Sequence, residues 1–176
     1  MAQGYSSPDQ AQEESDRGLA DAALRVADLL VQRGETLATA ESCTGGWIAK
    51  LLTDIAGSSA WFEGGAVTYS NSLKQKLLGV GSATLDRHGA VSRETAIEMV
   101  AGALNRFDTA IAVAVTGIAG PTGGTRDKPV GTVWIGWQRR GSDALVEGFR
   151  FDGDREAVRR QTAAAALRGI VKILTR

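Results

Sequence analysis

The sequence contains a single cysteine, Cys43, and a single histidine, His88, among its 176 residues. One cysteine cannot form an internal disulfide, and this scarcity fits the reducing cytosol. The two residues are also too few for a Cys/His zinc site, and a histidine-based catalytic triad is disfavoured. Any acyl-transfer chemistry in this chain therefore needs a base other than histidine.

An excess of charge of either sign is also absent, because twenty acidic residues balance twenty basic ones. No overall field attracts nucleic acid or an anionic membrane, so neither is expected as a partner. No apolar run approaches the roughly 20 residues that cross a bilayer. We therefore expect a cytoplasmic protein whose partner is a small molecule.

The N-terminal segment, residues 1–16, is polar and acidic and lacks the apolar core of a signal peptide. Such a composition favours a disordered tail. We expect a single domain over residues 17–176.

Apolar periodicity and turn residues divide this domain into alternating helices and strands. Helices are predicted at residues 19–33, 47–55, 71–78, 92–107 and 154–174, and strands at residues 36–40, 62–70, 110–115, 130–138 and 144–151. Asn71 and Ser92 are the expected N-caps of their helices. The last two strands should form a hairpin. The interleaved order predicts an α/β protein with a mixed sheet covered by helices.

Three polar, glycine-bearing or hydroxyl-rich segments each follow a predicted strand. They read ESCTGG at residues 41–46, TYSNSLK at residues 68–74 and TGIAGPTGG at residues 116–124. Open α/β sheets bind ligands outside the carboxyl ends of their strands. We therefore expect the three segments to converge on one site.

Ser42, in the first segment, is the candidate nucleophile. It precedes a predicted helix whose free N–H groups and positive dipole end favour an oxyanion, so the N–H groups of residues 43–46 are candidate donors. Gly45 and Gly46 permit close approach of the backbone to a ligand. The alternative is that Ser42 or Thr44 only caps the helix. Cys43 is a second candidate nucleophile, because a thiolate at a helix N-terminus is reactive.

Lys74, in the second segment, is the candidate base for Ser42, provided that desolvation or a neighbouring cation lowers its pKa. Tyr69 offers a second hydroxyl for proton relay. The alternative is that Lys74 is an ordinary solvated charge, since lysines are rarely buried. Lys50 and Lys76 are weaker candidates.

The third segment has backbone amides that suit a phosphate or a ribose, although it lacks the ending of a P-loop. Arg155, at the start of the last helix, is a candidate for bidentate phosphate binding. A helix cap followed by a solvated arginine explains the same residues equally well.

Six segments in this order resemble the CinA C-terminal domain family, and within it the stand-alone nicotinamide-nucleotide amidohydrolases. They read ESCTGGWIAKLLTDIAGSSAWFEGG, VTYSNSLK, GAVS, TGIAGPTGG, KPVGTVWIGW and GDREAVRRQ. The resemblance implies a three-layer α/β/α sandwich that forms a homodimer or higher homo-oligomer. It implies hydrolysis of the pyridine nucleotide nicotinamide mononucleotide to nicotinate mononucleotide and ammonia, in NAD recycling, without a metal or cofactor.

The resemblance also implies residue roles, with Ser42 as nucleophile, Lys74 as base and Tyr69 assisting. The candidate substrate-binding residues, from the three segments and the last helix, are Thr44, Gly45, Gly46, Asn71, Thr116, Gly117 and Arg155. Two alternatives stay open, because fold and function separate readily. One is a catalytically silent nucleotide-binding paralogue that acts as a sensor or partner module, and the other is an enzyme for a different amide-bearing nucleotide or nucleoside.

Overall fold

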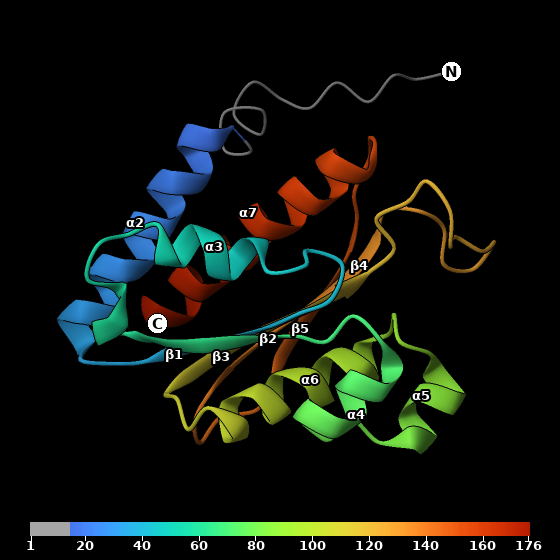
Figure 1. Cartoon of the computed structure of the whole chain (residues 1–176), viewed down its shortest axis with the longest axis horizontal. Coiled ribbons are helices and arrows are strands. Elements are labelled where there is room, and N and C mark those ends of the chain that lie inside the picture. The colour runs from blue at the N-terminus through green and yellow to red at the C-terminus, as the bar shows by residue number, and fades with distance from the viewer. Residues whose placement is uncertain (1–14) are drawn as a thin grey trace.

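The computed structural model describes residues 15–176 (Figure 1). Residues 1–14 of the predicted tail lie outside the described residues. Ser15 accepts a hydrogen bond from the Gly18 N–H and caps the first helix, α2 (Asp16–Arg33). This helix begins one turn earlier than its apolar pattern predicts, because residues 15–18 contribute a cap and a polar first turn rather than apolar contacts.

The centre of the molecule is a five-stranded sheet with the order β2-β1-β3-β4-β5. Its strands are β1 (Leu37–Glu41), β2 (Phe62–Val67), β3 (Ile111–Gly117), β4 (Thr132–Arg139) and β5 (Leu145–Arg150). β1 is parallel to both β2 and β3, whereas β4 runs antiparallel to β3 and to β5. The predicted mixed sheet and its late hairpin are confirmed.

Helices cover both faces of the sheet, as Figure 1 shows. One layer contains α2, α3 (Trp47–Thr53) and α7 (Arg155–Leu174), and the other contains α4 (Asn71–Leu78), α5 (Ser82–His88) and α6 (Arg93–Arg106). The expected three-layer α/β/α sandwich is therefore confirmed. α5 and a short 3-10 turn, η1 (Ser58–Ala60), are not among the predicted elements, because Leu85 is the one buried residue of α5 and η1 has only three residues, so neither shows a helical apolar period.

β3 separates the two halves of the core, because alternate side chains of a strand point to opposite faces. Val113 and Val115 belong to the cluster that packs against α2 and α7. Ala112 and Ala114 belong to the cluster on the other face, which includes Met99 of α6. The larger side chains thus fill the α2/α7 side, and the two alanines let α6 approach the sheet closely.

α4 packs directly on the backbone of α6. A Cβ added to Gly102 of α6 would lie only 2.0 Å from the Leu78 carbonyl oxygen at the end of α4, so glycine is required there. Ser70, rather than Asn71, caps α4, since the Ser70 hydroxyl accepts a hydrogen bond from the Leu73 N–H. Asn71 is the first helical residue, so its predicted capping role is wrong. The Ser92 cap of α6 is confirmed.

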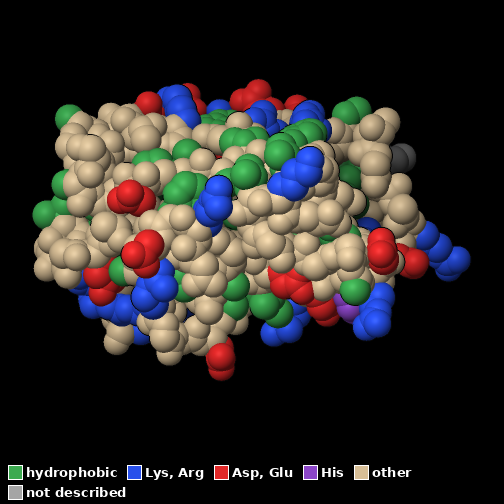
Figure 2. Space-filling model, turned by 60° about the horizontal axis from the view of Figure 1, so that its bottom comes forward, with side chains coloured by type: hydrophobic (Ala, Val, Ile, Leu, Met, Phe, Trp, Pro, Cys, Tyr) green, Lys and Arg blue, Asp and Glu red, His purple; other side chains and the backbone are tan. Residues whose placement is uncertain are grey.

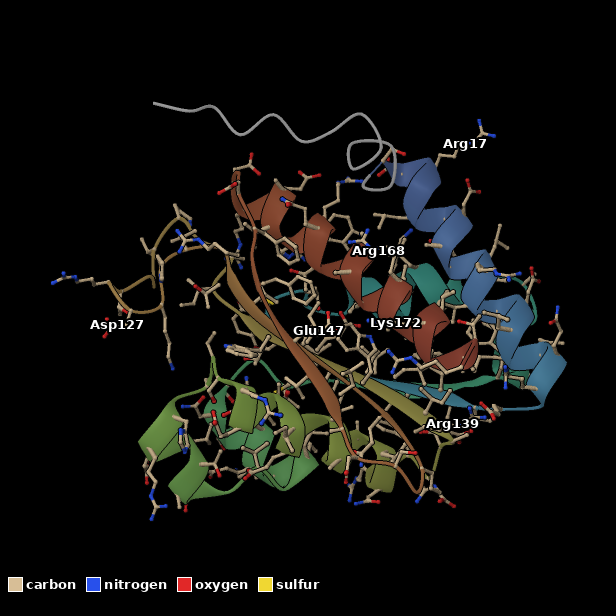
Figure 3. All side chains as sticks on the ribbon, turned by 180° about the vertical axis from the view of Figure 1, so that it is seen from behind. Arg17, Asp127, Arg139, Glu147, Arg168 and Lys172 are labelled. Carbon is tan, nitrogen blue, oxygen red and sulfur yellow. The ribbon has the colours of Figure 1, made fainter. Side chains whose placement is uncertain are left out.

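The edge strand β5 carries charged side chains, which discourage pairing with another chain. Glu147 of β5 and Lys172 of α7 form an ion pair of 3.4 Å, and they lie close together in Figure 3. The face in Figure 2 carries acidic and basic side chains interspersed. Within residues 15–176, every helix is too short or too polar to span a bilayer.

Candidate active site

The three segments singled out in the sequence meet at one edge of the sheet. β2, β1 and β3 are neighbouring parallel strands, and Glu41 at the end of β1 pairs with Val67 of β2 and Val115 of β3. Parallel strands in this register end at the same level, so the residues that follow them lie together. The predicted convergence is confirmed.

Ser42 and Lys74 form the centre of this edge. Lys74 Nζ lies 3.0 Å from Ser42 Oγ, and it donates a second hydrogen bond to the Thr68 carbonyl oxygen at 2.7 Å. Ser42 is 8% exposed and Lys74 only 1%. Lys74 is therefore a buried amine held against a hydroxyl, and the alternative of a solvated surface charge is wrong. Lys76, on the same helix, is exposed.

Burial lowers the pKa of the Lys74 ammonium from 10.5 to about 8, because the charged form loses its hydration. An electrostatic interaction with the nearby Cys43 raises this pKa, but burial is the larger effect. Both hydrogen-bond partners of Nζ among the described residues are neutral oxygens, so neither restores the charged form as a carboxylate would. A usable fraction of neutral amine is thus present near neutral pH.

Glu41 is a site residue that sequence reasoning missed. Its carboxylate is 1% exposed and accepts four hydrogen bonds. Oε2 accepts from the Thr44 hydroxyl at 2.6 Å, the Gly46 N–H at 3.0 Å and the Ile48 N–H at 3.1 Å, and Oε1 accepts from the Ala49 N–H at 2.8 Å. The available signal is an acidic residue at the end of an otherwise uncharged strand, LATAE.

Glu41 changes the expected chemistry of the α3 N-terminus. Its carboxylate already occupies the N–H groups of the first turn, so they are not free for an oxyanion as the sequence suggested. The Thr44 hydroxyl is likewise engaged with Glu41. Their hydrogen bonds to Glu41 hold the backbone of residues 44–49 in place instead.

The turn of residues 42–46, called here the Ser42 loop, has two N–H groups that no other residue occupies. The Ser42 N–H donates to the Val115 carbonyl, and the Gly45 N–H donates to the Ser42 carbonyl. Among the described residues, the Thr44 N–H has no hydrogen-bond partner, and the Cys43 N–H contacts only the thiol of its own residue. Of the N–H groups of residues 43–46, those of Cys43 and Thr44 therefore remain the candidate oxyanion donors.

The glycines of the Ser42 loop are explained by its backbone. Gly45 and Gly46 have φ values of +62° and +96°, which are unfavourable for residues that carry a side chain.

The Cys43 side chain is buried, and desolvation raises the pKa of its thiol to about 12. A neutral, buried thiol is a poor nucleophile, so the geometry favours Ser42 over Cys43.

Arg155 and Tyr69 connect the second and third segments to α7. Arg155 donates one hydrogen bond to the Tyr69 hydroxyl at 2.9 Å and another to the Gly120 carbonyl at 2.8 Å. Tyr69 is 60% exposed, and among the described residues its hydroxyl contacts Arg155 rather than Ser42 or Lys74. It therefore lies at the mouth of the site.

Two of the three remaining predicted substrate-binding residues have structural contacts of their own. The Thr116 hydroxyl donates to the Ala90 carbonyl at 2.7 Å. Gly117 is the last residue of β3, where an added Cβ would be 2.6 Å from Val133 Cγ2. These contacts explain Thr116 and Gly117 without a ligand. Asn71 is exposed at the start of α4, and the substrate-binding roles of all three residues stay predictions.

A cationic cleft of about 410 Å³ borders the Ser42 loop and is lined by Trp47, Arg155, Glu156 and Arg159. Sequence reasoning missed Trp47 and Arg159 as site residues, since a tryptophan is more often a core residue and a helical arginine is more often solvated. The Arg159 guanidinium lies 5.2 Å from the centre of the Trp47 ring. The Arg155 guanidinium in this cleft suits an anionic ligand. Within residues 15–176, no three His, Cys, Asp or Glu side chains gather as metal ligands.

These features define an α/β/α protein whose candidate ligand site, with a hydroxyl and a buried amine at its centre, lies at the carboxyl ends of parallel strands. The family model of the CinA C-terminal domain matches residues 19–174. The chain therefore belongs to this family, as its sequence motifs indicated.

Relatives and solved structures agree with this assignment. The Escherichia coli K12 nicotinamide-nucleotide amidohydrolase PncC is 53% identical over 143 residues, covering 81% of this chain and 87% of that protein. The Geobacter sulfurreducens CinA-like protein is 53% identical over 142 residues, which cover 34% of its length. The crystal structure of the competence/damage inducible protein CihA from Agrobacterium tumefaciens has a TM-score of 0.86 at 45% identity, covering 90% of this chain and 96% of that one.

We expect Glu41→Gln to lower the free energy of unfolding by about 2 kcal/mol, because the new NH₂ group faces a backbone donor and leaves at least one hydrogen bond unmade. Urea unfolding at neutral pH measures this loss. Glu63→Gln, at an exposed position of β2, is the matched control and should change stability by less than about 0.5 kcal/mol. Equal stability of the two variants would contradict the structural role of Glu41.

Proposed function

We propose that this chain is an amidohydrolase that converts nicotinamide mononucleotide to nicotinate mononucleotide and ammonia, a step that recycles pyridine nucleotides. The observation that carries the proposal is the buried Lys74 amine, 3.0 Å from the Ser42 hydroxyl and with a pKa of about 8. The substrate follows from the relatives, since proteins about half identical over most of the chain are nicotinamide-nucleotide amidohydrolases.

In the first half of the reaction, neutral Lys74 accepts the Ser42 proton while Ser42 Oγ attacks the carboxamide carbon. The carbonyl oxygen becomes an oxyanion, for which the Cys43 and Thr44 N–H groups are the available donors. The C–N bond then breaks. The Lys74 ammonium returns its proton to the departing nitrogen, which leaves as ammonia.

In the second half, a water molecule attacks the pyridinecarbonyl ester on Ser42. Lys74, neutral again, accepts a proton from this water, and the same two N–H groups hold the second oxyanion. Collapse of the intermediate releases nicotinate mononucleotide and returns the proton to Ser42 Oγ. Lys74 thus acts as a base toward oxygen and as an acid toward the leaving group in each half.

The cationic cleft provides a place for the substrate phosphate. Arg155 uses two donors for Tyr69 and Gly120, and a guanidinium has five, so donors remain for an anion. Binding the phosphate at a distance from the scissile bond would orient the carboxamide on Ser42. We assign Tyr69 to the same region, where it positions Arg155.

A catalytically silent paralogue is less consistent with this site. Burying an amine without a carboxylate partner lowers the stability of the fold, and this has no benefit for a protein that only binds a nucleotide. A destabilising feature of this kind is typical of a functional site.

We expect Ser42→Ala and Lys74→Met each to reduce ammonia release from nicotinamide mononucleotide by at least about 10³-fold, because each removes one partner of the proton transfer. Lys76→Met, at an exposed position on the same helix, is the matched control and should retain wild-type turnover. An ammonia-coupled assay with the purified proteins measures all three. Normal turnover by Ser42→Ala would rule out the proposed nucleophile.

The rate should rise with pH and level off above about 8. Lys74 must be neutral to accept a proton, and its pKa of about 8 means that activity is lost as pH falls below that value, by about tenfold per unit. Measuring kcat/KM between pH 6 and 10 tests this dependence. A flat profile from pH 6 to 9 would exclude Lys74 as the titrating base.

Removing the substrate phosphate should lower kcat/KM. We expect kcat/KM for nicotinamide riboside to be about 10- to 100-fold lower than for the mononucleotide, as for the loss of one or two charge-assisted hydrogen bonds. Arg155→Ala should impair the mononucleotide far more than the riboside. Equal use of both substrates by the wild-type protein would show that the cleft does not bind phosphate.

Three expectations from the sequence stay predictions. They are the homodimer or higher homo-oligomer, the cytoplasmic location, and the boundary between a tail over residues 1–16 and one domain over residues 17–176. Analytical ultracentrifugation of the full chain measures the first.

A further inference from the structure

Arg159 of α7 donates hydrogen bonds to two backbone carbonyl groups of the Ser42 loop. Its Nε donates to the Cys43 carbonyl at 3.1 Å and its NH2 group donates to the Thr44 carbonyl at 2.8 Å. The guanidinium is half-buried and stacks 5.2 Å from the Trp47 ring centre, at the start of α3. It is therefore held against two consecutive peptide groups by packing as well as by hydrogen bonds.

The first of these bonds sets the direction of the Thr44 N–H. Cys43 and Thr44 are joined by a trans peptide, since the cis bond among the described residues is that of Gly120 and Pro121. In a trans peptide the C=O and the next N–H point in opposite directions within one rigid plane. Fixing the Cys43 carbonyl on Arg159 thus aims the Thr44 N–H away from Arg159.

The second bond fixes the direction of the Cys43 N–H indirectly, through a second peptide group. The Thr44 carbonyl on Arg159 belongs to the same rigid plane as the Gly45 N–H, which donates to the Ser42 carbonyl. The Ser42 carbonyl in turn shares its plane with the Cys43 N–H. The two donors of Arg159 therefore orient the two N–H groups of the Ser42 loop that bond to no other described residue.

We propose that Arg159 is a positioning residue which fixes the Cys43 and Thr44 N–H groups as the oxyanion donors for the acyl transfer at Ser42. This inference rests on the proposed function. Arg159 acts through the peptide planes and does not touch the reacting atoms. Its positive charge also polarises the Cys43 carbonyl, which makes the Thr44 N–H of that peptide a stronger donor.

Arginine suits this role better than lysine does. The planar guanidinium presents several donors in a fixed geometry, which match two carbonyl oxygens on successive peptides. A lysine ammonium at the same place can approach one carbonyl but has no rigid fork to hold both planes. Arg159→Lys should therefore recover only part of the activity lost by Arg159→Met, which keeps an apolar stem against Trp47 but has no donor.

The experiment compares Arg159→Met and Arg159→Lys with Arg160→Met. Arg160 is the matched control, because its guanidinium lies 5.1 Å from the same Trp47 ring and pairs with Asp16 and Glu156. Steady-state kinetics with nicotinamide mononucleotide give kcat and KM separately, and thermal unfolding checks the fold. A fluorophosphonate probe supplies a second measure, because Ser42 Oγ bonds to its phosphorus and fluoride leaves, without any need for the nucleotide.

We expect Arg159→Met to lower kcat by about 10- to 100-fold, less than the loss of a whole oxyanion donor, with KM within about threefold of wild type. Arg159→Lys should be intermediate, and Arg160→Met should stay within about twofold. Phosphonylation of Ser42 should slow in the same order, since it also places negative charge on an oxygen. Should Arg159→Met fail to fold, a lowered kcat in Arg159→Lys at an unchanged melting temperature supports the same conclusion.

Two results overturn the inference. One is an unchanged kcat and labelling rate in both Arg159 variants, and the other is a raised KM with unchanged kcat, which would make Arg159 a substrate contact. A wild-type protein that releases no ammonia but is labelled at Ser42 refutes the proposed function alone, and the labelling rates then decide the role of Arg159. Absence of labelling at Ser42 in the wild-type protein contradicts both proposals.

Discussion

The site depends on the desolvation of one amine. Lys74 is almost completely buried, and its hydrogen-bond partners among the described residues are a hydroxyl and a carbonyl oxygen rather than a carboxylate. This environment favours the neutral form, and the resulting pKa of about 8 suits the amine to its proposed role as the base for Ser42. The close contact of Gly102 with Leu78 and the Ser70 cap keep α4, and with it Lys74, in place.

The Ser42 loop is held from two opposite sides. On one side, Glu41 accepts hydrogen bonds from the Thr44 hydroxyl and three backbone N–H groups, and on the other, Arg159 donates to two backbone carbonyls. Within residues 15–176, the N–H groups of Cys43 and Thr44 bond to no other residue. A turn with so many fixed bonds reorganises little when a charge develops beside it, which is the condition for effective electrostatic stabilisation.

The parallel half of the sheet brings these parts together. The ends of β1, β2 and β3 lie at one edge, so Ser42 and Lys74 become neighbours although they are far apart along the chain. α7 completes the edge, because its first two turns contribute Arg155 and Arg159. The antiparallel pair β4 and β5 extends the core, and among the described residues neither strand forms a hydrogen bond with Ser42 or Lys74.

The sequence by itself determined the α/β class, most of the strands and helices, the family and the three segments that form the site, because apolar periodicity and local glycine and hydroxyl patterns are properties of short stretches. It identified Ser42, Lys74 and Arg155 as candidates, but it could not distinguish a buried lysine from a solvated one. Only the tertiary structure decided that Lys74 is buried beside Ser42, that Glu41 binds the N–H groups of the α3 N-terminus, and that Arg159 forms hydrogen bonds with the Ser42 loop. Each of these rests on contacts between residues brought together by strand order and helix packing, and burial, pKa and hydrogen-bond partners arise from those contacts rather than from neighbours along the chain.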